Sequence, residues 1–446
     1  MPSFVEASMD WQAQGSKAGI VITLPIRLRL RCLKAKSSEA TGTFGMWGRN
    51  ARVLVLTEPF WSLPMSWIYF YRTIFLSQSI GLSEVQIGLL ATVYTFLSTI
   101  APLAGGYLAD RFGRKKTLML FDSVGFLSAL TVWFITKDIW FALIAYLLEG
   151  LPAVIFSVWE CLLVEDTAPK YRASIYGYVS AIYNVGALST PIAGYLVGLY
   201  GVDIGYRTLC AVAFALLVPM FMIRVMLLRE TEIGHQIMEE KTFSGFGGYA
   251  ASLSIIRRNR VMAALLFVSI SGSFYYAVAR YMPLYLVDAK GIGLSSELAS
   301  LVPSISSISA LMIVSFVVPR LSSKGDYVGA LVSGQALGCM SMLLLSFSPT
   351  GSLPFVLASG AVLGVFNATA FSVSRTFLTN EIEAVDNRAR AKILSITITL
   401  SSLLNLPAPI LAGYLYSLNP KLPFLAMSSV LVISLAILLA AKRQRE

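Results

Sequence analysis

The sequence predicts an all-α polytopic membrane protein with twelve transmembrane helices in two pseudo-symmetric six-helix bundles. Three observations predict this class. Of the 446 residues, 56% are hydrophobic and 13% are charged, whereas a soluble protein carries about 25% charged residues. Apolar segments long enough to cross a bilayer follow one another from Asn50 onward. Short breaks between these segments carry most of the basic residues.

The apolar segments are numbered here as helices 1 to 12. Each can satisfy its backbone hydrogen bonds internally, which hydrocarbon requires. The twelve predicted helices cover residues 52–76, 84–108, 115–136, 139–164, 171–199, 206–228, 260–286, 294–318, 327–347, 353–378, 391–417 and 422–441.

Basic residues predict the orientation of the chain. Lys and Arg gather in the breaks after helices 2, 4, 6, 8 and 10 and in the C-terminal tail, whereas the opposite breaks hold Lys137, Arg207, Lys290 and Lys421. Because positive charge stays cytoplasmic, we expect a multi-pass protein of the cell membrane with both termini in the cytoplasm. The net charge of +11 is explained in this way, and no stacking aromatics accompany the basic clusters, so no nucleic-acid partner is expected.

Four regions are predicted along the chain. Residues 1–48 form an N-terminal extension that we expect to be disordered, with Met46 as a plausible start of the protein; the alternative is a basic segment on the membrane surface. Residues 49–229 form the N-terminal six-helix bundle, 230–257 a cytoplasmic linker, and 258–446 the C-terminal bundle. The bundles resemble each other at a nearly constant offset, as in the recurrence of Ala193-Gly194-Tyr195-Leu196 as Ala412-Gly413-Tyr414-Leu415.

The turn after helix 2 carries the most specific motif. It reads Gly106-Tyr107-Leu108-Ala109-Asp110-Arg111-Phe112-Gly113-Arg114-Lys115-Lys116. This resembles the G-x-L-a-D-r-x-G-r-[KR]-[KR] loop of the major facilitator superfamily, in the place where that family has it. The resemblance implies alternating access between two bundles. It also implies a cytoplasmic latch, for which the candidate gating residues are Gly106, Asp110, Arg111, Gly113 and Arg114.

Helix 5 partly resembles the antiporter motif G-x8-G-x3-G-P-x2-G-G of the same family. Gly186, Pro191 and Gly194 match the motif and are gating candidates, whereas Thr190 and Tyr195 stand where the motif has glycine. Helix 4 departs from the proton-linked exporters as well, because Tyr146 occupies the position of their arginine.

Ionisable residues inside predicted spans indicate function, since they are costly in hydrocarbon. By the family resemblance, helices 1, 4, 7 and 10 line the central cavity; they carry Glu58, Arg72, Glu149, Glu160, Arg280 and Arg375. Glu149 is the first choice for a proton carrier or substrate contact, with a structural hydrogen bond as the alternative. Glu160 lies 11 residues after Glu149, which is about three helical turns, so the two carboxylates are expected to share one face of helix 4.

The remaining candidates have assigned roles. Glu160 and Arg375 occupy equivalent repeat positions and are predicted to form an inner gate pair; the alternative is pairing within each half, for example with Arg172 or Glu381. Glu58 is predicted to handle substrate or protons, with a buried pair to a basic residue as the alternative. Arg72 and Arg280 are predicted to attract an anionic substrate or to serve as outer-gate partners, with snorkelling to the headgroups as the alternative. Asn184 and Asn405 add polar substrate contacts. Asp122 is expected to be structural, and helices 6 and 12 are expected to be apolar, lipid-facing supports.

The predicted function is secondary active transport of a small solute by alternating access, with coupling to protons, as a drug or metabolite exporter or an organic solute permease. The expected partners are a small-molecule substrate, protons and the lipid bilayer, and the expected state is a monomer. Four unpaired cysteines and the single His235 favour neither a metal site nor a cofactor, and no catalytic cluster indicates an enzyme. The alternatives are a non-transporting sensor or scaffold on a transporter fold and a uniporter without ion coupling.

Overall fold

The computed structural model describes residues 44–240, 259–385, 397 and 399–443. Residues 48–446 form one compact unit and residues 1–47 another. The predicted disorder of the N-terminal extension and most of the predicted linker lie outside the described residues. Within the described residues every regular element is helical, which confirms the all-α prediction.

The helices of the first half, residues 49–229, follow the predicted spans closely. Several begin with a side-chain cap, such as the reciprocal bonds of Ser83 and Gln86 or the bonds that Asp138 accepts from the amides of Trp140 and Phe141. The elements are α2 (Arg49–Gln78), α3 (Glu84–Phe112), α4 (Arg114–Ile135), α5 (Ile139–Gly150), η1 (Leu151–Ile155), α6 (Phe156–Val164), α7 (Pro169–Leu188) and α8 (Thr190–Leu227), followed by α9 (Glu232–Glu240).

The second half is more broken. Its spans include two π-helical turns, η2 and η4, and several short helices. The elements are α11 (Arg260–Ala279), α12 (Met282–Val287), α13 (Ser296–Ala299), α14 (Leu301–Met312), η2 (Ile313–Val317), η3 (Val318–Arg320), α15 (Lys324–Ser346), α16 (Leu353–Asn367), η4 (Ala368–Val373), α17 (Ser374–Val385), α19 (Ala408–Leu418) and α20 (Leu422–Arg443).

Helix 4 is not straight, and this corrects one expectation. A 3₁₀ segment that contains Pro152 separates α5 from α6, and the two parts of the span are inclined by 43°. Proline has no N–H to donate, and a 3₁₀ turn advances the chain by a different angle from an α-turn. The straight-helix premise that placed Glu149 and Glu160 on one face is therefore wrong.

Helices 5 and 6 are joined without a long loop. Predicted helix 5 breaks at Ser189, next to Pro191, and its second part continues in α8. Gly201 adopts a φ of +76° inside α8 and turns the chain from helix 5 into helix 6. Only glycine enters this region of φ readily, so a single residue makes the outer turn.

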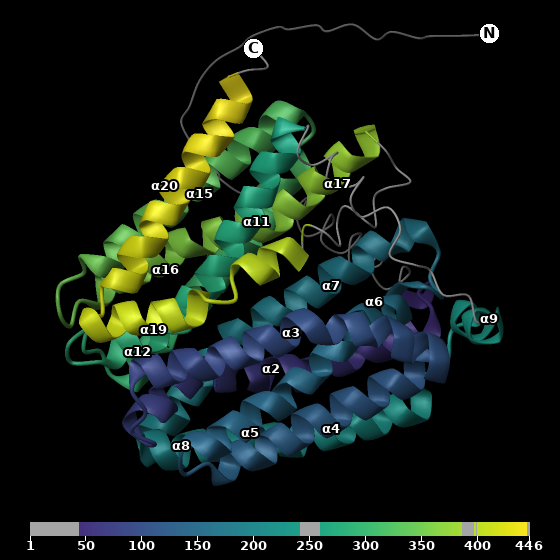
Figure 1. The fold of residues 1–446 in the computed structure, drawn as a ribbon, viewed down its shortest axis with the longest axis horizontal. Coiled ribbons are helices and arrows are strands. Elements are labelled where there is room, and N and C mark those ends of the chain that lie inside the picture. The colour runs from purple at the N-terminus through teal and green to yellow at the C-terminus, as the bar shows by residue number, and fades with distance from the viewer. Residues whose placement is uncertain (1–43, 241–258, 386–396, 398, 444–446) are drawn as a thin grey trace, which may run out of the picture. The chain divides into compact units, whose positions relative to one another are not determined.

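Neighbouring helices pack within each half. In the first half α8 packs against α2 and α4, and in the second half α15 packs against α16 and α20 (Figure 1). Contacts also join the halves, between α2 and α12, α3 and α19, and α7 and α14. These contacts involve the helix ends that the charge pattern predicts to be outer.

Eight helices in the described residues are long and apolar enough to cross a membrane, or nine if the bent helix 4 counts as one span. One of the eight, Pro169–Leu227, covers two predicted spans, helices 5 and 6. Part of helix 11 lies outside the described residues. The multi-pass character is therefore established, and the number twelve stays a prediction, as does the division into bundles at the predicted boundaries.

Gly186 lets helices 5 and 1 approach closely, and its replacement tests this packing. A Cβ atom at Gly186 would lie 2.5 Å from Ser62 Oγ and 2.7 Å from the Ser62 carbonyl oxygen, whereas one at Gly177, in the same helix, would meet nothing within 4 Å. We expect Gly186→Ala to lower the melting temperature of the purified protein and Gly177→Ala to leave it unchanged or raise it. Equal melting temperatures for the two variants would contradict this packing.

Candidate functional site

A buried ion pair lies at the centre of helix 4. Arg72 of α2 and Glu149 of α5 form two contacts, of 3.0 Å between Nη1 and Oε1 and 2.9 Å between Nη2 and Oε2. Their side chains are 7% and 2% exposed. Trp133 Nε1 donates to the second carboxylate oxygen at 3.0 Å. The first contact is a charge-assisted hydrogen bond, and the second brings the remaining nitrogen within ion-pair distance of the carboxylate.

Aromatic rings surround this ion pair. The Arg72 guanidinium lies 4.6 Å from the ring centroid of Trp133, 5.0 Å from that of Tyr69 and 5.4 Å from that of Tyr146. Tyr69 is 40% exposed, so the group is not sealed on every side. Cation–π contacts of this kind stabilise a desolvated cation.

The aromatic rings extend to the second half of the chain. The ring of Tyr146 lies 6.0 Å from that of Tyr94 in α3, and the Arg280 guanidinium lies 5.2 Å from the Tyr94 centroid. Arg280 follows α11 and is half-buried. We call the following residues the Glu149 cluster: Tyr69, Arg72, Tyr94, Trp133, Tyr146, Glu149 and Arg280.

A second buried group lies nearer the inner end of the first half. Arg224 of α8 contacts Glu58 Oε2 at 2.7 Å and Asp122 Oδ2 at 3.4 Å, and its Nε donates to Thr57 Oγ1 at 2.9 Å. The Tyr183 hydroxyl donates to Glu58 Oε1 at 3.0 Å. We call Thr57, Glu58, Asp122, Tyr183 and Arg224 the Arg224 cluster.

Sequence reasoning missed Arg224. Helix 6 was expected to be an apolar, lipid-facing support, yet Arg224 is 2% exposed and contacts two carboxylates. The expectation for helix 6 overlooked this residue, because a lone arginine near the end of a span resembles the snorkelling residues that mark orientation. The sequence did contain a signal for Arg224. Two acids, Glu58 and Asp122, lie inside spans of the first half, and no buried basic residue was assigned to either of them.

The turn after helix 2 is held by groups from helix 4 and from the segment before α9. Arg114 pairs with Glu165, and the Lys115 amide donates to Glu230 Oε2 at 2.9 Å. Gly113 adopts a φ of +89° between α3 and α4, which favours glycine. In the neighbouring loop, burial together with Glu232 and Glu230 raises the pKa of Asp166.

The other motif residues are at the surface or in α3. Asp110 and Arg111 are exposed, and Arg111 Nη1 donates to the Tyr107 hydroxyl at 2.9 Å. Gly106 lies within α3. The predicted role of Asp110 in a cytoplasmic latch stays a prediction.

Glu160 and Arg375 come together at the inner end of the two halves. Arg375 Nη2 lies 3.5 Å from Glu160 Oε1, with side chains 67% and 33% exposed, respectively. Glu381, an alternative partner for Arg375, contacts Lys324 Nζ at 2.6 Å.

Neutral hydrogen bonds join the halves at the outer ends. The Tyr71 hydroxyl donates to the Ser296 carbonyl at 2.7 Å, the Tyr281 hydroxyl to the Glu84 carbonyl at 2.9 Å, and Ser304 Oγ to the Leu188 carbonyl at 2.9 Å.

The small residues of helix 5 lie at close contacts. A Cβ atom at Gly194 would lie 2.3 Å from Ser300 Oγ, so this glycine permits the approach of helix 5 to helix 8. Gly186 lies against Ser62 as described above, and Pro191 is in the first turn of α8.

The two asparagines are used within the fold. Asn184 Nδ2 donates to the Ser180 carbonyl of its own helix at 2.8 Å. Asn405 Nδ2 donates to the Ser401 carbonyl at 2.7 Å and to the Ile270 carbonyl at 3.1 Å, and Asn405 is 6% exposed. Asn405 thus ties helix 11 to helix 7, and both of its amide hydrogens have acceptors.

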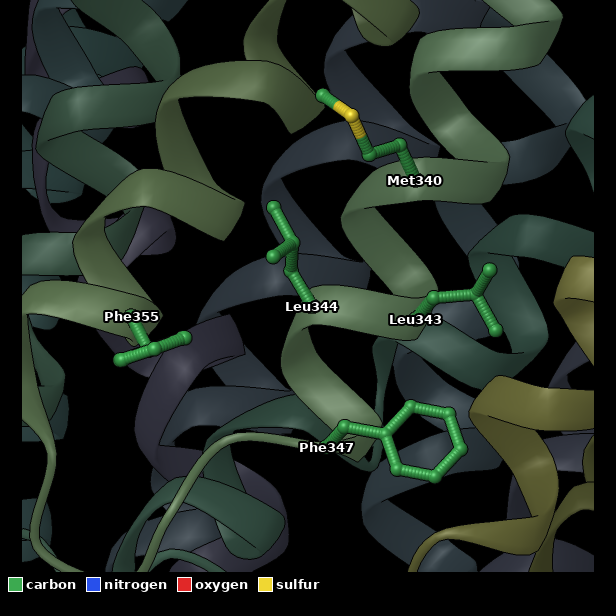
Figure 2. A pocket seen from close by; sticks show the side chains of 5 residues that line it. All are labelled: Met340, Leu343, Leu344, Phe347 and Phe355. Carbon is green, nitrogen blue, oxygen red and sulfur yellow. The ribbon is translucent and has the colours of Figure 1, made fainter.

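An apolar pocket lies apart from both charged clusters. Figure 2 shows its lining by Met340, Leu343 and Leu344 of α15, by Phe347 directly after that helix, and by Phe355 of α16. Four of these side chains are between 37% and 67% exposed, as expected for a surface that faces acyl chains. Its lining offers no polar group to orient a solute. No group of three or more His, Cys, Asp or Glu in the described part of the chain could hold a metal ion.

The buried pair of Arg72 and Glu149 yields a stability prediction. Glu149→Leu leaves a buried guanidinium without its carboxylate, which costs about 3–5 kcal/mol, whereas the double replacement Arg72→Met with Glu149→Leu recovers most of the loss. Asp203→Asn, which breaks the exposed pair with Arg207, costs about 0.2–1 kcal/mol. Melting temperatures of the purified variants in detergent measure this order of stability. If the Glu149→Leu variant were as stable as the Asp203→Asn variant, the buried pair would be refuted.

Comparisons with known proteins agree with this fold. Residues 62–403 match the family model of the Major Facilitator Superfamily. Multidrug resistance protein 2 of Bacillus subtilis (strain 168) is 24% identical over 373 residues, which are 82% of this chain and 88% of that protein. A Na(+), Li(+), K(+)/H(+) antiporter of Planococcus maritimus is 22% identical over 257 residues, which are 54% of this chain and 58% of that protein.

A solved structure shares the fold. The crystal structure of the nucleoside transporter NupG superposes with a TM-score of 0.64 at 14% identity, covering 88% of this chain and 98% of that one. The family model spans well over half of the 446 residues, and the helical, multi-pass architecture agrees with it. The chain therefore belongs to the Major Facilitator Superfamily and is a membrane transporter.

Proposed function

We propose that this protein moves a small organic solute across the cell membrane by alternating access, coupled to protons, with both termini in the cytoplasm and the monomer as the working unit. The observation that carries the proposal is the Glu149 cluster. It gathers charged groups from both halves of the chain around aromatic rings of the first half, at the depth of the membrane. Groups that meet between two halves can change partners when the halves move.

The Glu149 cluster offers suitable chemistry for an organic solute. Tyr69 and Tyr94 present rings for an apolar or aromatic body. Arg280 contacts the Tyr94 ring, and within the described residues no acidic side chain lies in ion-pair range of it. A cation without a neutralising carboxylate favours a solute that carries an anionic or electron-rich group. The named relatives are a multidrug resistance protein and a cation/proton antiporter, and export is the direction that we favour for this protein.

The present arrangement corresponds to a state closed on the outer side. The halves contact each other through Tyr71, Tyr281 and Ser304. We propose that the pair of Glu160 and Arg375, which is formed here at 3.5 Å, bridges the inner ends of the two halves, and that the inner side opens when this pair separates.

Proton coupling is tested in proteoliposomes with an imposed pH gradient and a screen of labelled organic anions, cations and neutral aromatics. We expect the wild-type protein to accumulate a solute in proportion to the gradient and to lose accumulation when an ionophore collapses it. Glu149→Gln, which removes the charge that holds Arg72, should abolish accumulation, and Asp203→Asn should not. Gradient-independent movement by the wild-type protein would rule out proton coupling, and normal accumulation by Glu149→Gln would remove Glu149 from the site.

The inner gate pair is tested by exchanging its charges. Glu160→Arg places two guanidiniums together and should slow transport several-fold, as should Arg375→Glu. The double exchange restores opposite charges and should recover most of the wild-type rate, because the coupling energy belongs to the pair. Rates of the single and double variants that simply multiply would contradict a gating role for the pair.

A further inference from the structure

The Arg224 cluster has an imbalance of charge. Two acidic side chains and one basic side chain meet there: Glu58 from α2, Asp122 from α4 and Arg224 from α8. From α7 the neutral hydroxyl of Tyr183 faces the same group. Two carboxyl groups against one guanidinium leave a net charge of −1 if both acids are ionised.

Burial makes that net charge costly. The side chains of Arg224, Glu58 and Asp122 are 2%, 5% and 7% exposed, respectively. A buried carboxylate without its own counter-charge tends to bind a proton and become neutral. The Glu149 cluster differs, because its single carboxylate is matched by Arg72 in two contacts. Electroneutrality therefore requires a proton in the Arg224 cluster and requires none at Glu149.

The geometry indicates where the proton resides. Glu58 receives two donors, Arg224 Nη2 at 2.7 Å and the Tyr183 hydroxyl at 3.0 Å. Asp122 has one contact with Arg224, at 3.4 Å. Donors stabilise the ionised form, so Glu58 is the better-held anion and Asp122 is the acid that takes the proton.

The cluster is connected to the contact between the halves. Tyr183 is 41% exposed, so its hydroxyl links the buried Glu58 to the outside of the cluster. Its helix, α7, packs against α14 of the second half, and the Leu188 carbonyl at its end accepts the bond from Ser304. A displacement of α7 therefore changes two contacts at once: the hydrogen bond from Tyr183 to Glu58 and the contact between the halves. This shared displacement couples the proton to the transport cycle.

We propose that the Arg224 cluster binds one exchangeable proton, carried by Asp122 while Glu58 stays paired with Arg224, and that this is the proton coupled to transport. The inference rests on the proton-coupled transport proposed above. Helices 3 and 6, which contribute Asp122 and Arg224, thus take part in coupling.

The test uses the proton itself as the probe. Infrared difference spectra of the purified protein, recorded as the solution is taken from acidic to alkaline pH, report the C=O band of protonated buried carboxyl groups. We expect the wild-type band to lose one carboxyl in Asp122→Asn and also in Glu58→Gln, because either change leaves a neutral pair with Arg224. Glu149→Gln should retain that band, and Asp122→Glu should restore it.

The outcomes separate the two proposals. Three results would overturn the proton site. The wild-type protein could show no titrating carboxyl band. The band could persist in both Asp122→Asn and Glu58→Gln, or it could disappear in Glu149→Gln. If Asp122→Asn fails to fold by size-exclusion chromatography, Glu58→Gln carries the same test. In proteoliposomes, gradient-driven accumulation by the wild type that persists in Asp122→Asn overturns the site alone, whereas accumulation by the wild type without a gradient overturns proton coupling as well.

Discussion

The pairing of buried guanidiniums with carboxylates organises the first half of this transporter. Lipid gives helices no hydrophobic reason to associate, so polar contacts and close packing must select the arrangement. The helix α2 takes part in both pairs, through Arg72 with Glu149 and through Glu58 with Arg224. It is therefore bound to α5 at its outer part and to α8 at its inner part. Removal of either charge would leave its partner unpaired inside the membrane.

The two clusters use the same residue types for different purposes. In the Glu149 cluster, the Glu149 carboxylate is balanced by Arg72 and enclosed by rings, and Arg280 adds a cation, unpaired among the described residues, from the second half of the chain. In the Arg224 cluster, the acids outnumber the base and every charged member comes from the first half. A balanced pair resists a change of protonation, whereas an unbalanced group invites it. Solute recognition and proton binding can thus be separated in space.

Much of this fold could be predicted because hydrocarbon imposes simple rules on sequence. The spans, their breaks and the loop from Gly106 to Lys116 are visible as runs of apolar residues and as a motif. The candidate acids were equally visible, because Glu58 and Glu149 interrupt such runs. Their partners were less visible: Trp133 lies 16 residues from Glu149, and Arg224 lies 166 residues from Glu58. Contacts between distant helices depend on rotation about each helix axis, and local breaks such as the 3₁₀ segment at Pro152 change that rotation.

The hydrogen bonds at the outer ends have a consequence for where the protein can work. Three of them run from a hydroxyl to a main-chain carbonyl, so neither partner carries charge. Such bonds are indifferent to screening by salt, and their acceptors cannot be altered by side-chain substitution. The pair of Glu160 and Arg375 is ionic and partly exposed, and salt weakens it. Under the orientation proposed above, with both termini in the cytoplasm, the uncharged seal faces surroundings whose salinity and acidity fluctuate, and the salt-sensitive contact faces the regulated interior of the cell.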